Sequence, residues 1–426
     1  MNSNIYSTTL DNGLQVIFKE VHTTPIISSW IWYRVGSRNE VEGATGLAHW
    51  VEHMLFKGSA HFPKGSIMRL VDRYGGYANA MTSRDFTAYY ETLPSAQALL
   101  ALQIEADRMI SATFDPTEVE TERTVIIAER EGSENEPTFV LNEEMVASAF
   151  HVHPYHHQTV GWKSDLERIT QEELYSFYRR YYGPQNAILV IVGDFQRDEI
   201  LAQISDQFGS IPANPKPVEI GRPEPPQRGE RRLTVHLPGS TPIIRIAYHV
   251  PPVAHPDYLP LVILDGILSG GHAPFSGGGT LARSARLYRA LVETQLASSA
   301  SSYYQASLDA YLFNLGAVVR QDRKANEVEE ALLEQVRKLQ EETVPESDLQ
   351  IAIRQTQAQL AFANESVNNQ ALALGMLAIV DNYARLDGFL GELATVTPVD
   401  IMRVAQSYLI ADNRIAGWFE PLAGGA

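Results

Sequence analysis

Two histidines and a glutamate lie close together in one short stretch near the N-terminus. His49, Glu52 and His53 fall within residues 45–58, whose alanine, leucine, valine and methionine residues favour a helix. Residues four apart stand on the same helix face, so both imidazoles can reach one metal ion, with Glu52 about 100° round the helix beside them. The order His-x-x-Glu-His reverses the commoner His-Glu-x-x-His zinc helix, and the stretch therefore predicts a zinc site.

Two histidines are too few for a catalytic zinc ion, which usually takes three protein ligands and keeps a fourth position for water. The acidic stretch 118–131 is the best source of the third, since it carries an apolar stripe and reads as a helix. Glu122 and Glu129 are seven residues, or two turns, apart and share a face of that helix. One of them could ligate the ion while the other binds a ligating imidazole. An ordinary solvated acidic face is the alternative.

Composition limits the classes of partner. The 426 residues are long enough for two or more domains, and 51 acidic against 34 basic residues give a net charge of −17. This charge argues against nucleic acid and anionic membranes as partners and is compatible with basic peptides. The absence of cysteine excludes thiolate zinc sites and cysteine nucleophiles. Because we see no signal peptide and no apolar run of membrane-spanning length, we expect a cytoplasmic protein without a membrane span.

The pattern of the first half begins again after a proline-rich stretch. Residues 211–232 hold six prolines among charged residues and read as a linker. The tetrapeptide Thr-Pro-Ile-Ile at 24–27 recurs at 241–244. The ends of the two halves also correspond at an offset of 227, in the pairs Thr170 and Thr397, Leu174 and Ile401, Tyr181 and Tyr408, Asn186 and Asn413, and Ile188 and Ile415.

This repetition predicts an α+β fold of two homologous domains, each a mostly antiparallel sheet flanked by helices. The predicted boundaries are an N-terminal zinc-bearing domain at 1–210, the linker at 211–232 and a C-terminal domain at 233–426. The helix expected at 258–268 places Leu261, Leu264 and Asp265 opposite the two histidines and the glutamate. The C-terminal domain therefore carries no metal motif.

Two segments resemble the M16 (pitrilysin-like, inverzincin) metallopeptidases, and in particular the M16B branch of mitochondrial processing peptidase and its bacterial relatives. Residues 49–58 look like the signature His-x-x-Glu-His-Met-x-Phe-Lys-Gly of that family, and residues 122–129 are similar to its downstream Glu-Arg-x-Val-Ile-x-x-Glu segment. The gap of 129 − 53 = 76 residues suits the family. The resemblance covers essentially the whole chain.

The resemblance implies a role for each candidate residue. His49, His53 and Glu129 would hold one Zn²⁺ per chain, Glu52 would be the general base and Glu122 would support a ligating imidazole. The implied activity is that of a zinc endopeptidase, which cleaves peptides or unfolded segments with metal-activated water.

A third segment bears on the substrate. Residues 79–90 are similar to the edge strand of the family, whose backbone pairs with an extended peptide, and Asn79 and Ala80 match the binding positions. An ordinary core strand is the alternative interpretation.

Two further segments are rich in residues that could bind ligands. The histidine-dense run 151–157 lacks helical spacing, so we interpret it as a polar loop and not as a second metal site. The glycine-rich run 270–279 has no Gly-Lys-Ser/Thr after it and is not a phosphate loop. It looks like the glycine-rich loop of processing peptidases, which belongs to their subunit without zinc.

The chain departs from the family in its second half. Active members contribute an Arg and a Tyr from a segment resembling Arg-x-x-x-Gly-Leu-Ala-Tyr. Residues 286–288 match the start of that region, but residues 291–298 lack both side chains at the matching places, and Tyr303 or Tyr304 would have to substitute. We therefore expect a dimer, either a homodimer or a heterodimer with a homologous chain that supplies the Arg and Tyr.

A non-proteolytic role is the second hypothesis. The M16 family also includes structural or assembly subunits among the core proteins of respiratory complexes. Such chains usually lose the metal residues, whereas this chain keeps His49, Glu52, His53 and Glu129.

Overall fold

The contacts within the chain divide it into two units, each assembled from three separate segments. The computed structural model describes residues 5–214, 217, 223–275 and 282–422. Unit 1 is formed by Met1–Glu131, His157–Arg222 and Asn364–Tyr383. Unit 2 is formed by Gly132–His156, Pro223–Ala363 and Ala384–Ala426.

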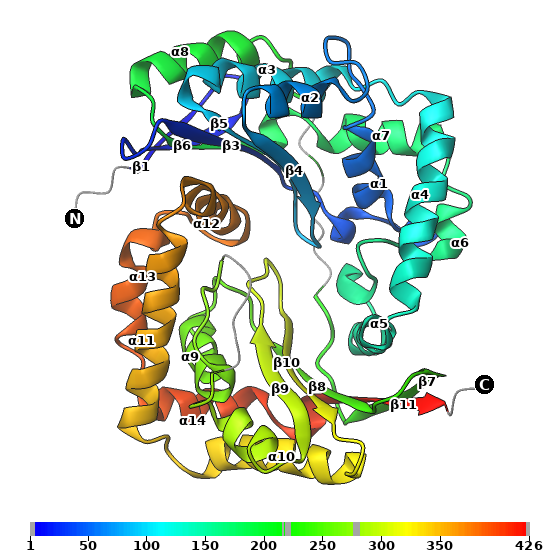
Figure 1. Ribbon diagram of the computed structural model, residues 1–426, viewed down its shortest axis with the longest axis vertical. Coiled ribbons are helices and arrows are strands. Elements are labelled where there is room, and N and C mark those ends of the chain that lie inside the picture. Colours follow the sequence, from blue (N-terminus) through cyan, green and yellow to red (C-terminus); the bar gives the residue numbers. More distant parts are fainter. Residues whose placement is uncertain (1–4, 215–216, 218–222, 276–281, 423–426) are drawn as a thin grey trace. The chain divides into compact units, whose positions relative to one another are not determined.

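Unit 1 is built on a six-stranded sheet in the order β1-β2-β6-β3-β5-β4 (Figure 1). Its β2 and β6 are parallel and the other neighbours are antiparallel. The strands are β1 (Ile5–Thr9), β2 (Gln15–Glu20), β3 (Ile26–Tyr33), β4 (Tyr77–Thr82), β5 (Thr87–Pro94) and β6 (Ala187–Gly193). The helices of this unit are α1 (Leu47–Met54), α2 (Ser66–Arg73), α3 (Ala98–Ser111), α4 (Pro116–Glu134), which runs on into unit 2, α6 (Lys163–Leu166), α7 (Gln171–Tyr181), α8 (Arg197–Phe208) and α12 (Val367–Val380).

Unit 2 is built on a five-stranded sheet in the order β7-β11-β8-β10-β9. Only β7 and β11 are parallel among its described strand pairs. The strands are β7 (Arg231–Pro238), β8 (Ile243–Val250), β9 (Ala297–Tyr304), β10 (Tyr311–Val319) and β11 (Arg414–Leu422). The helices are α5 (Pro137–Ala149), α9 (Tyr258–Ser269), α10 (Ala325–Glu341), α11 (Glu346–Ala363), α13 (Arg385–Leu393) and α14 (Pro398–Tyr408), with a π-helix at Tyr288–Val292.

The predicted α+β class, with two mostly antiparallel sheets flanked by helices, is confirmed. The order β2-β6-β3-β5-β4 in unit 1 corresponds to β7-β11-β8-β10-β9 in unit 2, with the one parallel pair in the same place. Residues paired at the offset of 227 also make equivalent contacts in the two units. Thr170 and Thr397 each cap a helix through a capping box, at α7 and α14. Asn186 and Asn413 each donate to the carbonyl at the end of that helix, at 2.9 and 2.7 Å.

Two helices lie in a different unit from their neighbours in sequence. Helix α5, from the first half of the sequence, packs on β7, β8 and β11 of unit 2, and α12, from the second half, packs on β3 and β6 of unit 1. Gly375 of α12 lies directly against the buried ring of Trp32. The predicted boundaries 1–210, 211–232 and 233–426 describe the repeated sequence segments and stay a prediction. The compact units are not continuous in sequence, because α5 and α12 each belong to the unit formed mainly by the other half of the chain.

Local boundaries differ from the sequence-based expectations at two places. The helix expected over 45–58 spans only Leu47–Met54. Strand β7 begins at Arg231, within the predicted linker. Residues 215–216 and 218–222 of that linker, and 276–279 of the glycine-rich run, lie outside the described residues.

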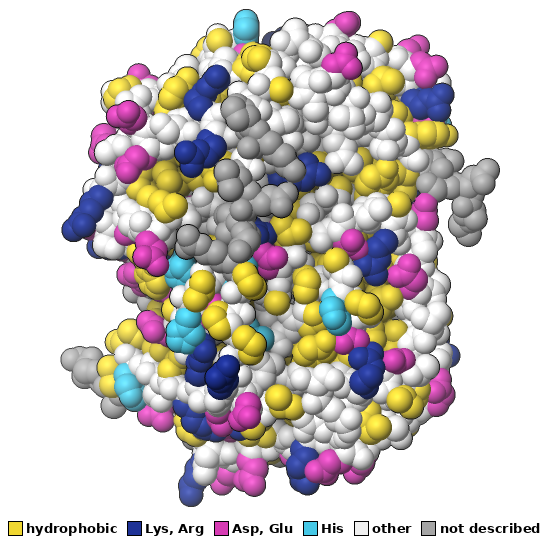
Figure 2. Space-filling model, turned by 180° about the vertical axis from the view of Figure 1, so that it is seen from behind, with side chains coloured by type: hydrophobic (Ala, Val, Ile, Leu, Met, Phe, Trp, Pro, Cys, Tyr) yellow, Lys and Arg dark blue, Asp and Glu magenta, His cyan; other side chains and the backbone are white. Residues whose placement is uncertain are grey.

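Charged side chains of both signs are interspersed on the face shown in Figure 2. The net charge of −17 is therefore not gathered into one acidic patch on that face. Within the described residues, no helix has the length and apolar character needed to cross a membrane.

Alanine at Gly375 should destabilise the protein although alanine favours helices. A Cβ there would overlap the Trp32 ring, and overpacking a filled core costs about 1–3 kcal/mol. The matched control is Gly391→Ala in α13, where the same methyl group meets open space and should stabilise by about 0.5–1 kcal/mol. Urea unfolding of both variants measures the difference, and equal stabilisation would contradict the packing of α12 on β3.

Candidate metal centre

The first turn of α1 is held by a buried carboxylate. Glu40 accepts hydrogen bonds from the backbone N–H groups of Gly46 and Ala48, both at 2.8 Å, and lies 2.9 Å from His157 Nε2. Burial raises the pKa of Glu40, and His157 and the two backbone donors oppose that shift. Because the N-cap residue Gly46 has no side chain of its own, Glu40 supplies the cap from outside the helix.

Helices α1 and α4 bring the three predicted ligands together. The Nε2 atoms of His49 and His53 are 3.2 Å apart, and Glu129 Oε2 lies 3.8 and 3.7 Å from them. A tetrahedral zinc ion with bonds near 2.0–2.1 Å places its ligand atoms roughly 3.3–3.4 Å apart. Two imidazoles and one carboxylate at these spacings therefore fit zinc. Among the described residues, these three side chains are the one group of histidine and acidic residues whose ligand atoms lie close enough together to hold a metal ion.

Glu122 lies behind the cluster and not in it. Its Oε1 is 2.8 Å from His53 Nδ1, and its other oxygen pairs with Lys57. Burial acts to raise the pKa of Glu122, but the bonds to His53 and Lys57 outweigh burial and lower it. An ionised Glu122 accepts the Nδ1 proton of His53 and so leaves the Nε2 lone pair free to face the cluster.

The pKa values of the two imidazoles in the cluster are shifted in opposite directions. Burial, and then the neighbouring His53, lower the pKa of His49 to about 4. Burial also acts to lower the pKa of His53, but its bond to Glu122 and the charges of Glu129 and Glu52 raise it. A neutral ring at His49 leaves its Nε2 able to bind a cation, and a cation bound at His53 would take the place of the proton that the raised pKa of that ring favours.

Glu52 stands on α1 beside the cluster. Its Oε2 accepts a hydrogen bond of 2.5 Å from the hydroxyl of Thr82 at the end of β4. Burial raises the pKa of Glu52, while Thr82 and His53 act against that shift. A raised pKa makes this carboxylate a stronger proton acceptor than an exposed glutamate.

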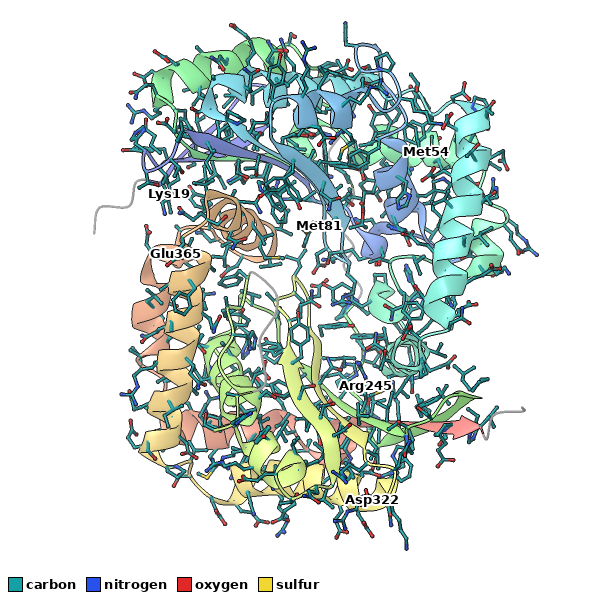
Figure 3. All side chains as sticks on the ribbon, in the orientation of Figure 1. Lys19, Met54, Met81, Arg245, Asp322 and Glu365 are labelled. Carbon is teal, nitrogen blue, oxygen red and sulfur yellow. The ribbon has the colours of Figure 1, made fainter. Side chains whose placement is uncertain are left out.

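Asn79 and Ala80 lie on the outermost strand of the unit 1 sheet. Strand β4 pairs with β5 on one side, where Asn79 faces Tyr90 and Ala80 faces Tyr89, and no described strand pairs with its other side. Figure 3 marks Met81 on this strand and Met54 at the end of α1. The strand therefore has an open backbone edge that an extended peptide could join.

The corresponding helix of unit 2 carries a polar cluster without metal-type geometry. Asp265 of α9, placed opposite His53 by the sequence, is fully buried. It accepts from the backbone N–H of Tyr304 at 3.1 Å and from the hydroxyl of Ser302, and lies 3.4 Å from His272 Nε2. These hydrogen bonds satisfy the carboxylate within unit 2.

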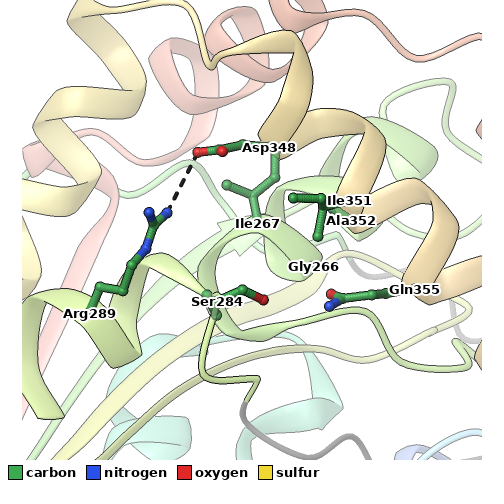
Figure 4. A pocket seen from close by; sticks show the side chains of 9 residues that line it. Gly266, Ile267, Ser284, Arg289, Asp348, Ile351, Ala352 and Gln355 are labelled. Atoms are coloured by element: carbon green, nitrogen blue, oxygen red, sulfur yellow. Dashed lines mark ion pairs between the residues drawn. The ribbon is translucent and has the colours of Figure 1, made fainter. Parts of the chain in front are cut away.

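Residues that flank the segment 291–298 have internal partners in unit 2. Arg286 and Arg289 approach Asp348 at 3.9 and 3.7 Å, and Figure 4 shows the Arg289 pair. Tyr304 is buried and donates to the carbonyl of Pro251 at 2.7 Å, so its hydroxyl is committed within unit 2. The ring of Tyr303 is 44% exposed, which leaves it as the better of the two candidate substitutes.

Comparison with known proteins gives the family. Residues 15–162 match the family profile described as Insulinase (Peptidase family M16), and residues 168–356 match the profile described as Peptidase M16 inactive domain. The two matches together cover most of the chain. The protein belongs to the M16 peptidase family.

Named relatives and solved structures agree with this assignment. The chain is 29% identical to the zinc protease PqqE of Helicobacter pylori, over 94% of this chain and 89% of that protein. It is 24% identical to a probable mitochondrial-processing peptidase subunit beta of Arabidopsis thaliana, over 96% of this chain and 77% of the other. A crystal structure of a Helicobacter pylori protease superimposes with a TM-score of 0.92 at 28% identity, over 98% and 100% of the two chains.

One further structure shares the fold at greater length. The periplasmic protease PqqL of Escherichia coli matches with a TM-score of 0.77 at 19% identity, over 99% of this chain but only 48% of that one. The fold of this chain thus corresponds to about half of that two-part protein.

Sequence reasoning missed three residues around the cluster. Glu40 and His157 fix the start of α1, and Thr82 binds Glu52. His157 lay in the run interpreted as a polar loop, and Glu40 showed no spacing that marks a cap. Thr82 had a usable signal, because strand alternation places it on the same face as Ala80.

Glu129→Gln should weaken zinc binding by at least about tenfold. Loss of a group that merely supports a metal ligand already costs about 10- to 100-fold in metal affinity, and loss of a ligand should cost no less. The amide keeps the shape of the side chain but removes the anionic oxygen. Glu120→Gln on the same helix is the control, because Glu120 pairs with Arg123 and lies outside the cluster. Competition with a chelating dye measures the affinity, and stoichiometric tight zinc in Glu129→Gln would remove Glu129 from the ligand set.

Proposed function

We propose that this protein is a zinc-dependent endopeptidase that cleaves peptides or unfolded segments. The cluster of His49, His53 and Glu129, with its ligating atoms all within 4.8 Å of one another, is the observation that carries the proposal. The zinc protease named among its relatives supports the same reaction class. The single cluster in the described residues supports a stoichiometry of one ion per chain.

Each residue of the site has a distinct part in the proposed reaction. Zinc, when bound, would supply Lewis-acid chemistry that makes a water more acidic and polarises the scissile carbonyl. Glu52 would accept the proton of the attacking water on its carboxylate and pass it to the leaving amine. Glu122 would keep the proton of His53 on Nδ1, at the observed 2.8 Å.

The open edge of β4 supports the choice of extended peptides as substrates. A peptide that pairs beside Asn79 and Ala80 would be recognised through its main chain, so many sequences would be accepted. A folded protein cannot offer a free strand without unfolding locally, which favours peptides and unfolded segments.

We further propose that a second chain completes the site. Residues 291–298 lack the Arg and Tyr of the family pattern, and an oxyanion needs hydrogen-bond donors aimed at it. The match to about half of the two-part PqqL supports pairing with a homologous chain. The partner would be a second copy, or a sister chain that carries the Arg and Tyr.

A structural or assembly role in a larger complex is less well supported. It would not require two imidazoles 3.2 Å apart, backed by a buried carboxylate on one ring. Retention of this arrangement favours catalysis over a purely architectural function.

Glu52→Gln should retain zinc and lose activity by a factor of about 10²–10⁴, the usual contribution of a general base. The amide cannot accept the proton, while the three ligands are untouched. Hydrolysis of a quenched peptide and elemental analysis of the same preparation measure both properties. Wild-type turnover in a zinc-loaded Glu52→Gln preparation would exclude Glu52 as the base.

The isolated chain should be a weak peptidase, and a homologous chain with the Arg and Tyr but without the zinc motif should raise its rate at least about tenfold. Loss of one oxyanion donor typically costs about 10²–10³ in rate, which sets the expected range. Titrating the purified chain with its candidate sister, on a peptide substrate, measures the gain. Full activity that no addition improves would favour a homodimer using Tyr303 and would contradict the heterodimer.

A further inference from the structure

One side chain of the edge strand touches the proposed general base. Thr82 is the last residue of β4, and Glu52 lies within α1. The hydroxyl of Thr82 donates to Glu52 Oε2 at 2.5 Å, across 30 positions of sequence. This short bond to a carboxylate joins the strand with the open edge to the helix that carries two of the three predicted metal ligands.

The hydroxyl hydrogen of Thr82 has one favourable acceptor. Thr87 Oγ1 is 3.5 Å away and is neutral, whereas the Glu52 carboxylate is 2.5 Å away. The hydroxyl of Thr87 donates its own hydrogen bond to the carbonyl of Val35, at 2.9 Å. Because Thr82 has a single hydroxyl hydrogen, that hydrogen is directed to Glu52.

The backbone beneath Thr82 is fixed by its neighbours. The turn after β4 is closed by the N–H of Ser83, which donates to the carbonyl of Phe86 at 2.8 Å. The N–H of Ser37 donates to the carbonyl of Ser83 at 3.2 Å. A Cβ on Gly36 would overlap the Ser83 carbonyl, so this close approach needs glycine. The Thr82 hydroxyl is therefore presented to Glu52 from a held strand end.

The alternation of side chains along β4 turns Thr82 toward α1. Side chains alternate along a strand, so Ala80 and Thr82 share the face that meets α1, while Asn79 and Met81 share the other. A peptide paired beside Asn79 and Ala80 would thus lie on the strand whose end holds Glu52. One hydrogen bond, from Thr82 to Glu52, thus joins the strand with the open edge to the proposed proton acceptor on α1.

We propose that Thr82 is a positioning residue for Glu52. By occupying Oε2, it holds the carboxylate in one orientation and leaves Oε1 free for proton transfer. This inference rests on the proposed function of Glu52 as the general base. It adds a residue outside the His-x-x-Glu-His and Glu-Arg-x-Val-Ile-x-x-Glu motifs to the catalytic arrangement.

The test compares Thr82→Val, which removes the hydroxyl at nearly constant shape, with Thr82→Ser, which keeps it. Thr82→Val should lower kcat about 10- to 100-fold, the effect expected for a hydrogen bond to a charged group, with KM within about twofold and zinc retained. Thr82→Ser should stay within about threefold of wild type. Unchanged kcat in Thr82→Val, or an equal loss in Thr82→Ser, would overturn the inference.

Thr92→Val is the matched control at the other end of the same β4–β5 ladder. Thr92 pairs with Tyr77, and its buried hydroxyl lies 3.0 Å from Ser28 Oγ. Losing this bond should change stability and leave kcat unaltered. An equal fall in kcat for Thr92→Val and Thr82→Val would assign the effect to general loosening of the sheet and would also overturn the inference.

A crystal structure of zinc-free Thr82→Val gives a readout independent of activity. The Glu52 carboxylate should leave its single orientation and rotate or spread over several. An unchanged, fully occupied carboxylate would show that Thr82 does not position it. If Glu52→Gln instead retains wild-type turnover, the proposed function fails, while this crystal structure still decides whether Thr82 holds Glu52.

Discussion

The geometry of the candidate site depends on the fixation of helix α1 by a buried carboxylate. Glu40 binds two backbone N–H groups at the start of the helix, where unpaired donors would otherwise be buried. With that end fixed, the spacing of His49 and His53 along the helix sets their Nε2 atoms 3.2 Å apart. Two Nε2 atoms at this distance can face one cation, which would replace the proton that the raised pKa of His53 favours.

Around this helix, each polar group is oriented by another. Glu122 fixes His53, Thr82 fixes Glu52 and His157 contacts Glu40. Such supporting bonds reduce the freedom of these side chains, and enzymes use preorganisation of this kind for a large part of their rate enhancement. The candidate site is therefore an arrangement of paired side chains, and the three predicted ligands form only part of it.

The corresponding helices of the two units differ in how their polar side chains are arranged. Helix α1 presents its polar residues together at one cluster, whereas Asp265 of α9 is buried and bonded to Ser302 and to the backbone of Tyr304. The same sheet order thus supports a metal-type site in unit 1 and a satisfied core in unit 2. Fold alone does not determine the function of each unit, because the chemistry depends on the side chains placed on it.

The sequence by itself determined the helical pairing of His49 and His53, the fold class and the repeat at an offset of 227, because all three are expressed as spacing along the chain. Spacing alone left open which of Glu122 and Glu129 faces the cluster, and in the structure Glu129 lies 3.8 and 3.7 Å from the two Nε2 atoms. Only the tertiary structure revealed Thr82 on Glu52 and α12 on the sheet of unit 1. Those contacts join segments distant in sequence, and such long-range packing carries no periodic signal of its own.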